Sequence, residues 1–171
     1  MNQITSFYEK PNGTKIKLTW IKDKEIEKYK PCYQVYGICF NKKGEVLIRK
    51  DGEKYSLSGG TPEKGEAPLQ TLERELIEES DITIKKAISL GVQKVEYLSK
   101  NEQEGEDDIF YQYRYICLID KLLDQTPDPD NGKIYGRFFV PQNKVFEYID
   151  WGNVGNAMFS DAFKEFQNLL K

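Results

Sequence analysis

A short segment rich in carboxylates holds the residues of this sequence that could carry out metal chemistry. Glu75, Glu78 and Glu79 lie three and four positions apart, a spacing that places them on one side of an α-helix. Like charges at this spacing repel one another, and a hard divalent cation compensates them because it prefers clustered carboxylate oxygens. The alternative is an acidic helix face that is simply hydrated. Spacing alone favours the hydrated face, so the choice between it and a metal site depends on the surrounding residues.

The elements that must position these carboxylates are a helix and the loop before it. Residues 67–80 have helical periodicity, and Pro68 is typical of a first helical turn. Residues 58–65 read SGGTPEKG and are expected to form a loop, whose glycines let backbone carbonyls approach a ligand closely. Three leucines of the helix form a narrow apolar stripe that can pack against a sheet: Leu69, Leu72 and Leu76.

The remaining elements predict a mixed sheet with helices on its faces, which is an α/β fold. We expect residues 32–40 and 45–49 to form a hairpin, and the strand at 82–98 to break near Gly91. The expected strands are 15–21, 32–40, 45–49, 82–98, 109–119 and 133–140. The expected single domain covers residues 1–171, with an N-terminal extension at 1–30 and a C-terminal helix at 156–171.

Composition excludes several classes of protein. The net charge of −3 argues against a nucleic acid polymer as partner, and no apolar run is long enough to span a membrane. Histidine is absent, which excludes His-based triads and metal sites, so any metal is expected to bind oxygen ligands. Three cysteines without a C-x-x-C pair, and a first segment unlike a secretion signal, favour the reducing cytoplasm.

The order of residue types from Gly60 to Ile82 resembles the signature of the Nudix hydrolase family, G-x5-E-x7-R-E-U-x-E-E-x-G-U, where U is aliphatic. One position departs, because Asp81 stands where the family has Gly. That Gly follows the helix, where a left-handed conformation often ends it, and Asp adopts this conformation at moderate cost. We expect a small stability penalty and no loss of chemistry. The charged positions are filled by Glu66, Arg74, Glu75, Glu78 and Glu79.

The resemblance implies an α/β/α sandwich with a mixed β-sheet and a pyrophosphohydrolase activity that depends on Mg²⁺ or Mn²⁺. The expected substrate is a nucleoside diphosphate linked to another group, a nucleoside triphosphate or sugar nucleotide first, and the product a nucleoside monophosphate. Among motif residues, Glu79 is the candidate general base, Glu78 is also a catalytic candidate, and Arg74 is expected to orient a carboxylate such as Glu66. The implied metal ligands are Glu75, Glu78, Glu79 and the carbonyl of Gly59.

Several questions stay open from the sequence. The base could instead come from the acidic loop that carries Glu104, Glu106 and Asp107. Weak candidates for substrate contacts are Arg49, Lys54 and Tyr97, and candidates for stacking on a base are Trp20, Tyr36, Trp151 and Phe159. The alternative function is a non-catalytic Nudix-fold module that senses a nucleotide. Such modules usually lose the motif carboxylates, which this chain keeps. A homodimer is also left open.

Overall fold

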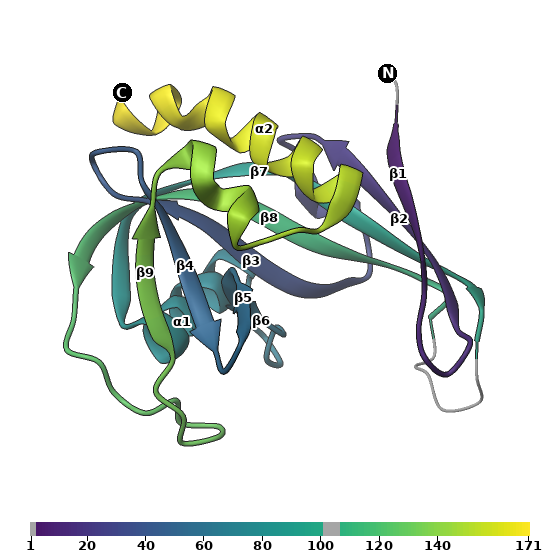
Figure 1. The fold of residues 1–171 in the computed structure, drawn as a ribbon, viewed down its shortest axis with the longest axis horizontal. Coiled ribbons are helices and arrows are strands. Elements are labelled where there is room, and N and C mark those ends of the chain that lie inside the picture. Colours follow the sequence, from purple (N-terminus) through teal and green to yellow (C-terminus); the bar gives the residue numbers. More distant parts are fainter. Residues whose placement is uncertain (1–2, 101–106) are drawn as a thin grey trace.

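The computed structural model describes residues 3–100 and 107–171, so the candidate bases Glu104 and Glu106 lie outside the described residues. The described part forms one sheet with a helix on each side (Figure 1). The elements in chain order are β1 (Ile4–Glu9), β2 (Lys15–Lys22), the 3₁₀ turn η1 (Ile26–Lys28), β3 (Cys32–Phe40), β4 (Val46–Asp51), β5 (Lys54–Ser56), β6 (Ser58–Gly60), α1 (Pro68–Ser80), β7 (Ile82–Ser99), β8 (Ile109–Leu122), β9 (Gly136–Val140), the 3₁₀ turn η2 (Gln142–Glu147) and α2 (Gly152–Leu170).

The sheet is mixed, as predicted. Its strands follow the order β1-β2-β7-β8-β3-β4-β5, with β6 added to β3 and β9 added to β4. Strands β3 and β8 run parallel, and the other pairs are antiparallel. The central strand β3 is paired with β8 on one side and with β6 and β4 on the other, which suits its almost uniformly apolar sequence.

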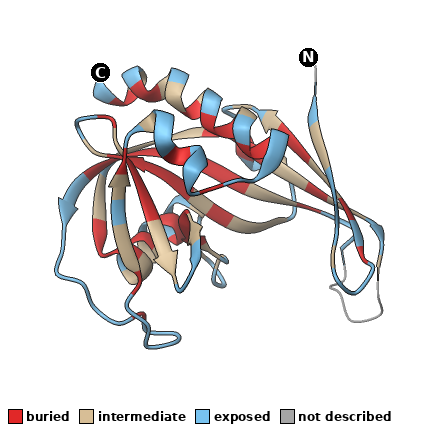
Figure 2. Ribbon diagram, in the orientation of Figure 1, coloured by how far each residue is buried: buried red, intermediate tan, exposed pale blue. Residues whose placement is uncertain are grey.

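The two helices cover opposite faces of this sheet because strand side chains alternate between faces. In the part of β3 from Gln34 onward, odd-numbered residues such as Val35 pack with Leu72 and Leu76 of α1. Even-numbered residues, such as Ile38, pack with Met158 of α2. Figure 2 shows the buried residues on the central strands and on the helix sides that face them. The predicted α/β/α sandwich is therefore confirmed.

One local expectation holds only in part, and another was wrong. Strands β3 and β4 form an antiparallel hairpin only at its tip, where Phe40 pairs with Val46, because β4 then turns away to pair with β5 and β9. Strand β7 also does not break at Gly91; the register with β8 shifts there instead. A Cβ at Gly91 would lie 2.3 Å from the carbonyl oxygen of Ile21, so the glycine permits close strand contact.

The N-terminal residues extend the sheet. Strand β1, which the sequence pattern did not reveal, forms an antiparallel pair with β2, and β2 pairs with β7 along its full length. Residues 58–60, expected within a loop, form β6 beside β3. Neither helix of the described chain is long and apolar enough to serve as a membrane span.

Candidate active site

Helix α1 begins and ends as its sequence requires. Pro68 occupies the first turn, where no backbone donor is needed, and the Ala67 amide donates to Gln70 Oε1 at 2.8 Å. The helix ends at Asp81, which is left-handed with φ 50° and ψ 48°. Its carboxylate accepts hydrogen bonds from the Thr126 amide and hydroxyl at 3.1 and 2.6 Å. Asp81 therefore adds a tie to the loop after β8 that a glycine could not supply.

Arg74 lies at the centre of the carboxylate cluster. Two of its nitrogens donate to Glu66 at 2.7 and 3.1 Å, and Nη1 donates to Glu75 and Glu78 at 2.9 and 3.0 Å. Another bond, of 3.1 Å, reaches the Thr61 carbonyl. The guanidinium lowers the pKa of Glu66 to about 2, because it stabilises the charged carboxylate. The arrangement holds the side chains of the motif in one orientation.

Glu79 is held from the opposite side. Its Oε1 accepts a 2.7 Å hydrogen bond from Arg49, and its Oε2 accepts a 3.0 Å bond from the Gly59 amide. Burial is the main cause that raises the pKa of Glu79 to about 7, with a smaller contribution from the charges of Glu75 and Asp128, although Arg49 and the Gly59 amide act in the opposite direction. Arg49 is fixed in turn by bonds to Ser56 and by stacking on an aromatic ring, that of Tyr135.

Glycines allow strand β6 to lie between β3 and the carboxylates of α1. A Cβ at Gly60 would come within 2.3 Å of Glu75 Oε1, and one at Gly59 within 2.1 Å of the Val35 carbonyl oxygen. Gly59 also has a φ of +157°, which favours glycine. Burial raises the pKa of Glu75, although Arg74 partly offsets this effect. Two half-buried carboxylates thus lie directly against the backbone of β6.

The expected meeting of three carboxylates around one ion is not seen in the described residues. No group of three or more cysteine, aspartate or glutamate side chains is arranged there to hold a metal. Glu75 and Glu78 share Arg74, whereas Glu79 bonds to Arg49. The donors nevertheless fit a hard cation, because they are carboxylate oxygens and the charges of Glu75 and Asp128 lie close enough to contribute to the raised pKa of Glu79. A cation there would replace arginine contacts with its own.

The other sequence candidates are distributed differently. Arg49 reaches the motif through Glu79, whereas Lys54 is exposed on β5. Tyr97 lines a surface cavity near Phe110. Asp107 bonds to the hydroxyl of Tyr33, and none of the contacts resolved for it joins it to a motif carboxylate.

Sequence reasoning missed the loop between β8 and β9 as part of this site. The charges of Asp128 and Asp130 raise the pKa values of Glu79 and Glu75, respectively, so these aspartates face the cluster. Asp128 is buried, and its Oδ1 accepts a 2.8 Å bond from the Asp130 amide. The available signal was the repeated aspartate in residues 124–132, DQTPDPDNG, a second acidic loop besides residues 101–108.

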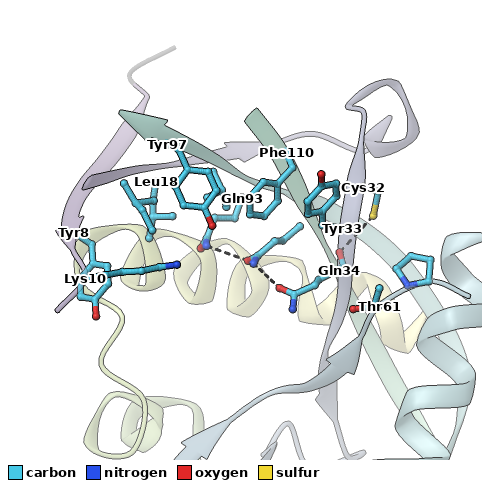
Figure 3. A pocket seen from close by; sticks show the side chains of 14 residues that line it. Tyr8, Lys10, Leu18, Cys32, Tyr33, Gln34, Thr61, Gln93, Tyr97 and Phe110 are labelled. Atoms are coloured by element: carbon cyan, nitrogen blue, oxygen red, sulfur yellow. Dashed lines mark hydrogen bonds between the residues drawn. The ribbon is translucent and has the colours of Figure 1, made fainter. Parts of the chain in front are cut away.

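A long groove opens beside the motif on the α2 side of the sheet. One cavity of about 880 Å³ reaches from Arg49 to Trp151, and another of about 650 Å³ reaches from Thr61 to Tyr97. Four lining residues are common to both cavities, so the two are continuous: Tyr8, Leu18, Gln93 and Gln112. Figure 3 shows the aromatic side chains and hydrogen-bonded glutamines that line the second cavity.

Comparison with known proteins now assigns the family. The NUDIX domain family matches residues 30–158, which is more than half of the chain, and the chain belongs to this family of Nudix hydrolases. The matched range includes β6, α1 and both arginines that hold the motif carboxylates. The comparison with curated protein sequences gives no match.

Solved structures share the fold at low identity. The pyrophosphohydrolase BsRppH of Bacillus subtilis has a TM-score of 0.64 and 18% identity, over 94% of this chain and 97% of that one. A NUDIX hydrolase of Listeria monocytogenes has a TM-score of 0.58 and 17% identity, over 81% and 96%. A MutT structure from a study of the Aliivibrio salmonicida and Vibrio cholerae proteins has a TM-score of 0.55 and 19% identity, over 77% of this chain and 95% of that one.

Proposed function

We propose that this enzyme hydrolyses the pyrophosphate bond of a nucleoside diphosphate linked to another group and releases a nucleoside monophosphate. Nucleoside triphosphates and sugar nucleotides are the first candidates. The observation that carries the proposal is the position of Glu75 and Glu79, whose half-buried carboxylates lie against Gly60 and Gly59. Carboxylate oxygens are the ligands that a hard divalent cation prefers, and the family membership supports the same chemistry.

The metal ligands we propose are Glu75, Glu78, Glu79 and the Gly59 carbonyl, with Mg²⁺ as the metal, or Mn²⁺. When bound, the ion neutralises the pyrophosphate oxygens and lowers the pKa of water. All of these protein groups are oxygen donors, and they lie on α1 or at its contact with β6. The charges of Asp128 and Asp130 add to the attraction for a cation at this position.

The residues of the chain would then have separate roles in the reaction. Glu79 accepts the proton of the attacking water, while the Gly59 amide holds one of its oxygens. Arg74 orients Glu75 and Glu78 through Nη1. Arg49, when it leaves Glu79, can neutralise a phosphate oxygen of the substrate, because its guanidinium lines the groove that opens beside the motif.

A nucleotide-sensing module without catalysis is the competing function. It is disfavoured by the complete set of motif carboxylates, since Glu75, Glu78 and Glu79 are all present and are oriented by arginines. We further propose that residues 1–171 act as one domain in the cytoplasm. The pairing of β2 with β7 supports the first of these points, and the three free cysteines support the second.

The test is a hydrolysis screen with the purified chain. Nucleoside triphosphates and sugar nucleotides are incubated with Mg²⁺ or with EDTA, and the products are identified by mass. We expect a nucleoside monophosphate and the complementary phosphorylated fragment, formed only with the metal. Binding of a nucleotide without cleavage of any compound would favour the sensing module instead.

A further inference from the structure

One arginine in the groove lacks the partners that a buried charge normally has. Arg114 on β8 is 3% exposed. Its Nη2 donates to Gln112 Oε1 at 3.0 Å and its Nη1 to the Tyr113 carbonyl at 3.3 Å, but Nε has no hydrogen-bond partner. Burial lowers the pKa of Arg114 to about 10, so the side chain is still charged at neutral pH.

No carboxylate of the described residues pairs with Arg114. Its guanidinium lies 4.6 Å from the centre of the Tyr36 ring, a contact that supplies no negative charge. Asp150 lines the same cavity, but its Oδ1 accepts from the Gly152 amide. A buried charge without a counter-ion destabilises a protein considerably. This arrangement is therefore expected to serve a ligand.

The position of Arg114 relates it to the motif. Gly59, Tyr36 and Arg114 lie opposite one another on the adjacent strands β6, β3 and β8. Two strand spacings separate the backbone of Arg114 from that of Gly59, which is ~10 Å. Both Arg114 and Arg49 line the cavity of about 880 Å³, so one ligand can reach both arginines.

The floor of the groove beside Arg114 is polar. Gln93 donates to Gln112 at 3.1 Å, and Gln112 donates to Gln34 at 2.6 Å. These bonds fix the amide of Gln112 so that its oxygen accepts from Arg114 Nη2, and Nε remains without a partner in the protein. Figure 3 shows this chain between Gln93 and Gln34, beneath Tyr97 and Phe110.

We propose that Arg114 is an anion-binding subsite, which takes a second acidic group of the substrate beyond the pyrophosphate at the motif helix. The acidic group supplies the counter-ion that the protein lacks and pairs with Nε and its neighbouring nitrogen. This inference rests on the proposed function for the identity of the substrate. The subsite itself can be detected without any hydrolysis. The proposed subsite predicts a preference for substrates whose second acidic group lies ~10 Å from the pyrophosphate, which is the separation between the backbones of Arg114 and Gly59.

The experiment measures thermal unfolding of the full chain in EDTA while inorganic phosphate is added at constant ionic strength. We expect phosphate to raise the Tm, because a ligand that binds only the folded state stabilises it. Sodium chloride at the same ionic strength and guanosine, an uncharged nucleoside, serve as comparison ligands. An equal shift with either would overturn the proposal.

Two variants complete the design. Arg114→Met removes the charge at similar volume, and we expect an unchanged or higher Tm without phosphate and loss of the phosphate shift. Arg137→Met is the matched control, because Arg137 donates to the carbonyls of Ser80, Asp81 and Leu123. That control should lower the Tm and keep the shift. If Arg114→Met lowers the Tm and keeps the shift, Arg114 is structural and the proposal is wrong.

The outcome can be separated from that of the proposed function. If the hydrolysis screen finds no substrate but the phosphate shift depends on Arg114, the subsite stands and the proposed function fails. If hydrolysis is found, Arg114→Met should raise KM several-fold for substrates with a second acidic group and change kcat little. Equal KM values for the two proteins, together with a retained phosphate shift, would remove Arg114 from recognition.

Discussion

Arg74 on the motif helix and Arg114 in the groove lie in opposite electrostatic surroundings. Arg74 donates to three carboxylates, those of Glu66, Glu75 and Glu78. Arg114 is more deeply buried, yet it bonds only to one amide oxygen and one backbone carbonyl. The charge of Arg74 is compensated by carboxylates of the chain itself, whereas the charge of Arg114 has no counter-ion among the described residues. The motif side is therefore ordered without a ligand, and we infer that the groove gains its counter-ion from a bound ligand.

The motif side and the groove also differ in the sign of their excess charge. On the motif side the carboxylates exceed the arginines, and burial raises the pKa values of Glu75 and Glu79. That side attracts a cation. In the groove the excess is positive, and Arg114 attracts an anion. A substrate that carries phosphate with an associated metal ion is complementary to both regions.

The largest effect is expected on turnover when the motif side is changed. Glu79→Gln should reduce kcat by at least about 100-fold, since a general base contributes roughly 10²–10⁴-fold. Glu73→Gln is the matched control, because Glu73 is exposed on the same helix. Steady-state kinetics and a thermal unfolding curve measure both variants. Near-normal kcat in Glu79→Gln would remove Glu79 from the mechanism.

The second prediction compares the two arginines directly by stability. Arg74→Met should lower the free energy of unfolding by about 2 kcal/mol, because it leaves several carboxylates without a charged donor. Arg114→Met should leave this free energy unchanged or raise it. Urea unfolding in EDTA measures both. If both variants lose stability equally, the contrast between a compensated and an uncompensated arginine is wrong.

A smaller effect is expected at the end of the motif helix. Asp81→Gly relieves the left-handed backbone but removes the two hydrogen bonds from Thr126, for a net loss of about 1 kcal/mol. Turnover should stay within a few-fold. Asp81→Asn, which keeps an acceptor and tolerates the conformation, is the control. A large gain in turnover with glycine would show that Asp81 impairs the site.

The smallest effect concerns acid stability. Arg74 holds the pKa of Glu66 at about 2, below its ordinary value of 4.5. The pair therefore stabilises the fold fully above pH 4.5, and this contribution is lost as pH falls towards 2. In Arg74→Met the loss over this range should be weaker, whereas Arg114→Met should follow the wild type. Unfolding curves between pH 2 and 5 test this, and identical slopes in all three proteins would contradict it.

Much of the fold was accessible from sequence because local patterns decide it. The apolar strand at 32–40 and the helix after Ala67 were placed closely, and Asp81 was expected to end that helix in a left-handed conformation. The short extent of the hairpin between β3 and β4 was not predicted, since the other partners of these strands come from distant segments. Strand β1 lies at the edge, where the apolar alternation is weak.

The candidate site was likewise predictable where local spacing decides it and not where tertiary contacts do. The motif placed Glu75, Glu78 and Glu79 on one helix, and their spacing made that grouping predictable. The aspartates that face them, Asp128 and Asp130, come from a loop whose path depends on tertiary contacts. The lack of a counter-ion at Arg114 was equally hidden, because sequence cannot show which charges meet. Of the four candidates for stacking on a base, Tyr36 and Trp151 line the groove, whereas Trp20 and Phe159 lie in the core.

We propose that the carboxylates of α1 bind the metal that hydrolysis requires. The most direct measurement is the rate of nucleoside monophosphate release against Mg²⁺ concentration for the wild type, Glu75→Gln and Glu73→Gln. We predict no release in EDTA, a higher Mg²⁺ requirement for Glu75→Gln and an unchanged one for Glu73→Gln. Release without a divalent metal, or the same Mg²⁺ dependence in all three proteins, would show that the α1 carboxylates do not bind a catalytic metal.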